Sequence, residues 1–251
     1  MTYCLAIALE EGLVFTSDSR TNAGIDHVST YSKMYVFGED GQRKIVLLSA
    51  GNLATTQAVV TRLRRDIEDQ KEVNLSNVSH MSDVAEYVGV VSRQQQDKHL
   101  DLAEKQKDFN PEASFIIGGQ LSGCRPEIYM IYAAGNYITT SEYAPYLQIG
   151  ESKYGKPILD RIITAKTPLE DAARCALVSM DSTMRSNASV GPPVELLVYR
   201  KDSLLIEHRL KLDADASYLY QLRKSWDEST RKAFGHLPKF EWESEWLSPY
   251  G

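Results

Sequence analysis

Thr2, the second residue of the chain, is the strongest candidate for a catalytic nucleophile. Removal of Met1, which is expected before a small residue, would leave Thr2 with a side-chain hydroxyl and a free α-amine. Such a residue is a nucleophile with its own base attached. Asp18 and Lys33 follow soon after it, and we expect the fold to bring both close to Thr2. A retained Met1 would turn the amine into an amide nitrogen, which cannot act as a base.

The sequence lacks the short motifs of several common enzyme classes. It has no Gly-rich phosphate loop, no dinucleotide fingerprint, no HExxH zinc motif and no GxSxG elbow. The scattered histidines, without metal-ligand spacing, are His27, His80, His99, His208 and His236. The cysteines, without a C-x-x-C pair, are Cys4, Cys124 and Cys175. We therefore expect no metal and no cofactor, and a serine–histidine hydrolase has little support.

Length and charge narrow the class of protein. The 251 residues, 43% of them hydrophobic, contain no linker or low-complexity segment, so we expect a single domain over residues 1–251. A net charge of −6 argues against a nucleic-acid binder. No signal-peptide pattern and no apolar run near the roughly 20 residues of a membrane span is present. We expect a soluble, cytoplasmic protein.

Hydrophobic periodicity in the first half predicts strands and then helices. Short apolar runs at 3–9, 13–17, 33–37 and 44–50 are typical of buried strands, and the polar stretch 20–29 is expected to be a loop. A spacing of three or four predicts a helix after Asn52, which is a good N-cap residue. A second helix from residue 82 is expected to run towards residue 107. Its distal part lacks an apolar stripe, so it should protrude or meet a partner.

The second half repeats this alternation. Strands are expected at 113–118, 127–133, 137–140, 194–199 and 204–212, and helices at 157–163, 168–184 and 214–232. Thr167, Pro168 and Glu170 form a strong helix start, with Thr167 as the cap. Two groups of strands with paired helices between them predict two packed sheets, each with an outer helical layer. The aromatic tail, from about residue 233 to 251, is expected to dock on the domain or on a neighbouring subunit.

A set of short segments carries a family resemblance. These are Thr2, residues 17–24 around Asp18, Lys33 between Ser32 and Met34, residues 49–51, and residues 147–157. Their order and spacing resemble the proteasome β-subunit and HslV group of N-terminal nucleophile hydrolases, and more closely its bacterial branch called Anbu. The resemblance covers nearly the whole chain. It implies an α+β fold, a four-layer αββα sandwich with two antiparallel sheets, and self-assembly into a homo-oligomeric ring or open ring.

The resemblance also implies a role for each residue. Thr2 Oγ would attack a peptide carbonyl while the Thr2 α-amine takes the hydroxyl proton through a water. An α-amine has a pKa of about 7.7–8.0 and a lysine about 10.4, so the amine is the better base near pH 7. Lys33 is then a fixed cation that lowers the pKa of the amine and the hydroxyl, and Asp18 keeps Lys33 charged. The N–H of Gly51 would face the developing oxyanion.

The positions that support the threonine amine depart from the β-subunit pattern. That pattern has an aspartate and then a serine before a late strand, where this chain has Ser186 and Ser189. Glu151 stands where the pattern usually has serine. Either a carboxylate has moved from one support position to the other, or the support is weakened; Asp181 could also substitute.

We therefore expect a threonine-type peptidase that acts on peptide or protein substrates. Two alternatives stay open. One is a non-catalytic assembly scaffold on the same fold, and the other is an amidohydrolase that acts on a non-peptide amide.

Overall fold

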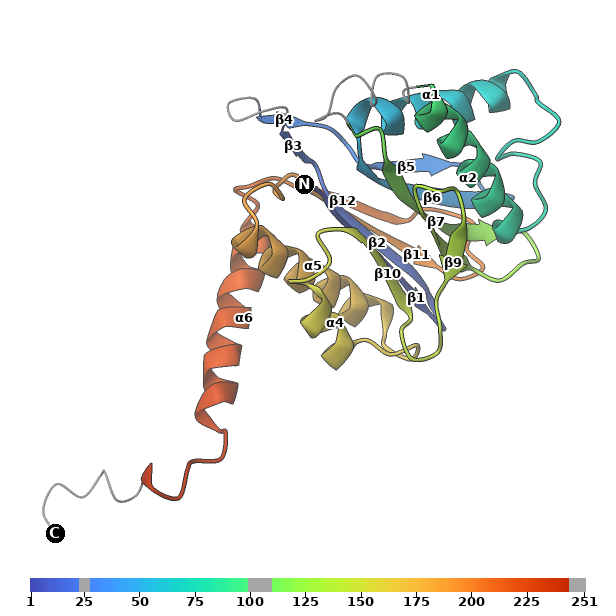
Figure 1. Cartoon of the computed structure of the whole chain (residues 1–251). Coiled ribbons are helices and arrows are strands. Elements are labelled where there is room, and N and C mark those ends of the chain that lie inside the picture. Colours follow the sequence, from blue (N-terminus) through green and yellow to red (C-terminus); the bar gives the residue numbers. More distant parts are fainter. Residues whose placement is uncertain (23–27, 99–109, 244–251) are drawn as a thin grey trace, which may run out of the picture. The chain divides into compact units, whose positions relative to one another are not determined.

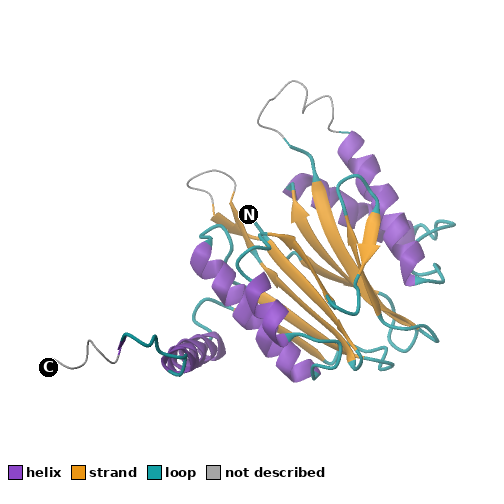
Figure 2. Cartoon of the chain, turned by 60° about the horizontal axis from the view of Figure 1, so that its bottom comes forward, coloured by secondary structure: helices purple, strands orange, loops and turns teal. Residues whose placement is uncertain are grey.

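The computed structural model describes residues 1–22, 28–98 and 110–243, and it divides the chain into two units. The first unit, Met1–Ala214, holds the sheets and all but one of the described helices. The second, Asp215–Gly251, contains helix α6. Within the first unit two sheets lie face to face and helices cover the outside of each (Figure 1, Figure 2).

The first sheet contains the N-terminal strand at its interior. Its order is β10-β1-β2-β11-β12, and all neighbours are antiparallel. The strands are β1 (Tyr3–Leu9), β2 (Gly12–Asp18), β10 (Tyr146–Gly150), β11 (Val194–Arg200) and β12 (His208–Leu212). Strand β2 is buried along its whole length and β1 almost so. Both faces of these strands are covered, which explains their nearly continuous apolar sequence.

The second sheet has the order β5-β6-β7-β8-β9, again antiparallel. Its strands are β5 (Met34–Phe37), β6 (Arg43–Gly51), β7 (Ala113–Leu121), β8 (Glu127–Ile131) and β9 (Tyr137–Thr139). The polar stretch 20–29 was expected to be a loop, and that expectation was wrong. Its ends pair as a short hairpin of β3 (Arg20–Asn22) and β4 (Val28–Thr30). Backbone pairing does not need an apolar face in so short a hairpin, so periodicity gave no signal.

Helices complete the outer layers. The second sheet is covered by α1 (Leu53–Glu68) and α2 (Met81–Asp97), and the first by α4 (Lys156–Ile162) and α5 (Leu169–Ser186) (Figure 2). One apolar core lies between the second sheet and its helices, and includes Leu47, Val59 and Val88. Another lies between the sheets and includes Phe15, Ile116 and Leu197. The predicted four-layer αββα sandwich is confirmed.

Three local expectations had different outcomes. Asn52 caps α1 as predicted, because its Oδ1 accepts a 3.1 Å hydrogen bond from the N–H of Thr55. Thr167 does not cap α5. Its Oγ1 accepts instead from the N–H of Thr164, and Pro168 takes the cap position. The distal part of α2 does not simply protrude, because Gln96 is buried and donates to the carbonyl of Ala133; the expected continuation to residue 107 lies outside the described residues.

The second unit consists of α6 (Ser217–Gly235) and the segment that follows it. Phe240 and Trp242 stack there with ring centroids 5.1 Å apart. Trp246 and the rest of the tail lie outside the described residues, so its docking stays a prediction. The single domain over residues 1–251 also stays a prediction. No described helix is long and apolar enough to cross a membrane.

Candidate active site

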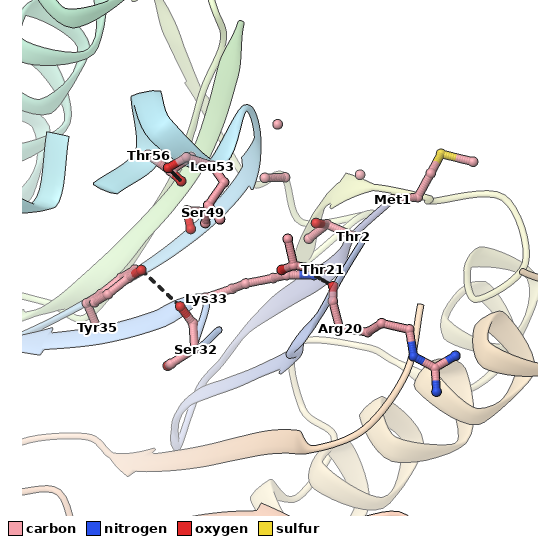
Figure 3. Close-up of a pocket in the computed structure, with 13 residues that line it drawn as sticks. Met1, Thr2, Arg20, Thr21, Ser32, Lys33, Tyr35, Ser49, Leu53 and Thr56 are labelled. Atoms are coloured by element: carbon pink, nitrogen blue, oxygen red, sulfur yellow. Dashed lines mark hydrogen bonds between the residues drawn. The ribbon is translucent and has the colours of Figure 1, made fainter. Parts of the chain in front are cut away.

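An open cavity of about 300 Å³ lies where the two sheets and helix α1 meet the start of the chain (Figure 3). It is lined by Met1, Thr2, Arg20, Thr21, Ser32, Lys33, Tyr35, Ser49, Ala50, Gly51, Leu53, Thr56 and Gly150. The structure thus brings together Thr2, Lys33 and Gly51, which lie far apart in sequence. Among the described residues no group of His, Cys, Asp or Glu side chains is placed to hold a metal ion. His27 and His99 lie outside those residues.

The backbone of Thr2 is held from both neighbouring strands. Its carbonyl oxygen accepts a 2.7 Å hydrogen bond from the N–H of Glu151. The next N–H, of Tyr3, donates 3.0 Å to Oδ1 of Asp18. Gly150, at a φ of +82°, lies against the Thr2 carbonyl so closely that any Cβ there would collide with its oxygen. Only glycine fits this position, and the location of Thr2 is fixed by it.

Asp18 and Lys33 form a buried ion pair beside the cavity. Lys33 Nζ donates to Asp18 Oδ1 at 2.7 Å and to the carbonyl oxygen of Arg20 at 2.7 Å. Asp18 also accepts from the N–H of Gly191 at 3.2 Å through Oδ2. An ammonium has three protons, and these bonds within the described chain use two of them. The third remains available to a group in the cavity that Lys33 lines.

Burial and the ion pair act on the ionisable groups of the site. Partial burial, and then the charge of Lys33, lower the pKa of the Met1 amine, while Asp18 opposes this. Burial raises the pKa of Asp18, and the charge of Lys33 opposes that shift. An amine at this end of the chain is therefore more often neutral at neutral pH than a free one, which suits a proton acceptor.

The N–H of Gly51 points to the side of β6 where the cavity lies. Successive N–H groups of a strand alternate in direction. The Ser49 N–H donates to the carbonyl of Lys33 at 3.0 Å, so the Gly51 N–H, two residues later, points the same way. Strand β5 begins only at Met34, and the Gly51 N–H extends past its end towards the cavity. Gly51 has a φ of +108°, and a Cβ there would collide with the carbonyl oxygen of Glu112.

Comparison with known proteins shows which family has this fold and this arrangement of residues. The model of the proteasome subunit family matches residues 2–199. Two solved structures match over nearly all of both chains. Anbu (ancestral beta-subunit) from Yersinia bercovieri is 42% identical, with a TM-score of 0.88, covering 96% of this chain and 99% of its own. The chain in a helical assembly of the Anbu complex from Pseudomonas aeruginosa is 44% identical, with a TM-score of 0.90 and full coverage of both.

The chain belongs to the proteasome family, in its Anbu branch. Anbu from Hyphomicrobium sp. strain MC1 is also similar, at 39% identity and a TM-score of 0.85, covering 96% of this chain and 100% of its own. Comparison with curated proteins gives no match. The proteasome resemblance seen in the sequence is confirmed.

Two of the support positions of this Anbu-type chain, Glu151 and Ser189, are linked by Asn187. Its Nδ2 donates to Glu151 Oε2 at 3.2 Å, and its Oδ1 accepts from the N–H of Ser189 at 2.9 Å. Ser186 is exposed, and Asp181 is buried with an ion pair to Arg185 at 3.1 Å. Neither Glu151 nor Ser189 lines the cavity itself.

Sequence reasoning missed three residues of the site. Asn187 connects two predicted positions, and Gly191 binds Asp18 through its N–H. Arg20 donates to the carbonyl of Ala188 at 2.7 Å and so attaches the loop that precedes β11 to the start of β3. Its side chain extends away from Lys33 (Figure 3). Arg20 follows Asp18 closely in sequence, which was a signal; the other two residues act across long sequence separations and gave none.

Proposed function

We propose that this chain is a threonine-type N-terminal nucleophile hydrolase that cleaves peptide bonds once Met1 has been removed. One observation carries the proposal. The buried pair of Asp18 and Lys33 borders the cavity that Thr2 lines, so a fixed cation lies beside a residue with a hydroxyl and a potential free amine. A buried ion pair is weak evidence for stability, but a cation held at a cavity wall suits electrostatic catalysis.

The reaction follows from these positions. Thr2 Oγ adds to the peptide carbonyl, and the Thr2 amine takes the hydroxyl proton through a water. The carbonyl oxygen becomes an oxyanion, which the Gly51 N–H faces. Collapse of this intermediate breaks the C–N bond, the leaving amine takes the proton, and Thr2 is left as an ester. A second water, activated by the same amine, hydrolyses the ester and restores Thr2.

Lys33 acts in this scheme as a charge rather than as a base. Its two hydrogen bonds, to Asp18 and to the carbonyl of Arg20, hold it in place, and its third proton is left for Thr2 Oγ. The positive charge favours the developing alkoxide and the neutral amine. Asp18 holds Lys33, while its bond to the Tyr3 N–H positions the backbone next to Thr2. Glu151, Asn187 and Ser189 support the same segment from the other side.

Self-assembly is the second part of the proposal. The structure of the Pseudomonas aeruginosa relative is a helical assembly of the Anbu complex. A ring or open ring of identical chains would enclose the cavity and limit the substrates that reach it. Analytical ultracentrifugation and electron microscopy of the purified chain test this, and a monomer at micromolar concentration would contradict it.

A non-catalytic scaffold on the same fold is the competing function. It is favoured by the exposed Ser186, which stands where the β-subunit pattern has a carboxylate. Intact mass separates the two cases first, because a natively expressed protein that uniformly keeps Met1 cannot use the Thr2 amine.

A small uncharged electrophile that acylates N-terminal threonine tests the nucleophile directly. The processed wild type should be labelled at Thr2, and Thr2→Ala should not. Thr21 lines the same cavity, so Thr21→Ala is a matched control that should label as wild type does. Equal labelling of wild type and Thr2→Ala would remove Thr2 as the nucleophile.

A further inference from the structure

Glu195 is a buried carboxylate that the proposed reaction does not use. It lies on β11, and only 4% of the residue is exposed. Its Oε2 accepts a 2.8 Å hydrogen bond from Nη2 of Arg209, on the neighbouring strand β12. Leu197, two residues further along β11, is buried between the sheets, and alternate residues of a strand share a face. Glu195 therefore faces the second sheet and holds Arg209 on that side.

Arg209 also reaches the second sheet. The same Nη2 donates to the carbonyl oxygen of Met34 at 3.3 Å. Met34 begins β5, the edge strand of that sheet, so one side of its backbone has no neighbouring strand. The carbonyl of Lys33 accepts from the N–H of Ser49 on β6, and the next carbonyl points the opposite way, to the free side. Arg209 therefore binds β5 on its free side, immediately after Lys33.

The four-residue segment that begins at Ser32 forms one wall of the cavity. Ser32, Lys33 and Tyr35 all line it. Within the segment, Ser32 Oγ donates to the Met34 carbonyl at 3.0 Å, and the Tyr35 hydroxyl donates to the Ser32 carbonyl at 2.9 Å. These bonds make the segment one unit, so the hydrogen bond from Arg209 acts on the whole wall.

We propose that Arg209, aligned by Glu195, is a positioning residue that keeps Lys33 at the correct distance from Thr2. The proposal rests on the proposed hydrolase function and deepens it. The Lys33 backbone is bonded to the second sheet, whereas its Nζ binds Asp18 at the end of β2 in the first sheet. Arg209 spans the same two sheets and so fixes the gap that Lys33 must bridge. A displacement of about 1 Å at a reacting group can cost about 100-fold in rate.

Two cations on β12 supply a matched pair of variants. Labelling of Thr2 over a range of electrophile concentrations separates the binding constant from the rate of acylation at saturation. We expect Arg209→Met to slow acylation about tenfold and to change binding by less than about twofold. Lys211→Met removes the same charge from the same face of β12, where the lysine side chain makes no hydrogen bond to the described cavity wall, and should label as wild type does. Equal slowing in both variants would mean that charge alone matters, and would overturn the proposal.

Glu195 variants separate alignment of the arginine from the charge of the carboxylate. Glu195→Gln keeps an oxygen that can accept from Arg209, whereas Glu195→Ala removes the acceptor. We expect Glu195→Gln to keep most of the acylation rate and Glu195→Ala to approach the rate of Arg209→Met. Equal slowing in the two Glu195 variants would show that the charge of Glu195 acts directly, and that Arg209 does not need its alignment.

Hydrogen exchange of the Ser49 amide tests the geometry without any chemistry at Thr2. This N–H donates to the Lys33 carbonyl, so its exchange reports how firmly the wall is held. We expect exchange about tenfold faster in Arg209→Met and unchanged in Lys211→Met.

The two measurements together separate this proposal from the function on which it rests. Labelled wild type with acylation unchanged in Arg209→Met would overturn the positioning role, whatever the exchange rate, and leave the hydrolase standing. If wild type is not labelled, the hydrolase proposal falls and the catalytic role of Arg209 falls with it; faster exchange in Arg209→Met would then support only its hold on the wall.

Discussion

Lys33 Nζ lies 2.7 Å from Oδ1 of Asp18, and both side chains are buried. The same carboxylate accepts hydrogen bonds from the N–H groups of Tyr3 and Gly191. Asp18 therefore fixes three things at once: the cation beside the cavity, the backbone that follows Thr2, and the loop before β11. A change at either member of the pair should affect chemistry and stability by different amounts.

Replacing Lys33 by Met removes the charge and keeps most of the chain length. We expect no labelling of Thr2 and a free energy of unfolding lower by about 3–5 kcal/mol, because Asp18 is left as a buried charge without its cation. Labelling and urea unfolding measure the two effects. The double variant with Asp18→Asn should regain part of the stability and none of the labelling. Labelling at the wild-type rate in Lys33→Met would contradict the role of Lys33.

The pKa of Asp18 sets a pH dependence of opposite sign for stability and activity. Burial raises this pKa in the folded state above its unfolded value. The contribution of Asp18 to stability is therefore complete below the unfolded pKa and is lost as pH rises through the folded pKa. Activity needs the ionised form, so the rate of Thr2 labelling should fall on the acid side at a pH above the ordinary range of an aspartate.

Unfolding measurements over the pH range in which the labelling rate falls test whether Asp18 is the group that titrates there. The difference in free energy of unfolding between wild type and Asp18→Asn should change across the pH window in which the labelling rate falls. A difference that is independent of pH would show that another group titrates there.

Gly150→Ala tests how closely Thr2 is held. The new methyl group would collide with the Thr2 carbonyl oxygen in addition to adopting a φ of +82°. Gly41→Ala is the control, because its φ is +77° and its Cβ would have no neighbour within 4 Å. We expect Gly150→Ala to lower the free energy of unfolding by about 2 kcal/mol more than Gly41→Ala does. We also expect Gly150→Ala, unlike Gly41→Ala, to abolish the labelling of Thr2. Equal losses in thermal or urea unfolding would mean that backbone conformation alone accounts for the effect.

Asn187 should matter through its bond to Glu151. Asn187→Asp keeps the acceptor for the Ser189 N–H but replaces the donor to Glu151 by a like charge. We expect slower labelling and a stability loss of about 1–2 kcal/mol. Adding Glu151→Gln removes the repulsion, so the double variant should recover part of the stability. Additive losses in this cycle would show that the two side chains are not coupled.

Local signals explain what the sequence predicted of the fold. The cap at Asn52 depends on residues within one turn, and the four layers follow from apolar periodicity, so both were readable. The β3–β4 hairpin carries no apolar pattern. Burial of Gln96 depends on a carbonyl at Ala133, far along the chain. Thr167 has a residue type typical of helix N-caps, but its Oγ1 accepts a hydrogen bond from the N–H of Thr164 instead.

The candidate site also contains residues that the sequence could suggest and residues that it could not. Thr2, Asp18, Lys33 and Gly51 have residue types that suggest chemistry, and the family resemblance gave them an order. Asn187 had no such signal, because its partner Glu151 lies 36 residues earlier in the chain and its amide suggests no reaction. The tight fit at Gly150 depends on the approach of two backbones, which no residue pattern records.

The hydrogen bonds that anchor the start of the first sheet begin at the Thr2 carbonyl and the Tyr3 N–H, one residue after Met1. Met1 itself is 65% exposed. The chain can therefore complete its fold with Met1 in place and lose this residue afterwards, without rebuilding any of those bonds. For the proposed hydrolase, removal of Met1 by an aminopeptidase would then be a one-way activation step, and access to this exposed methionine would set its timing.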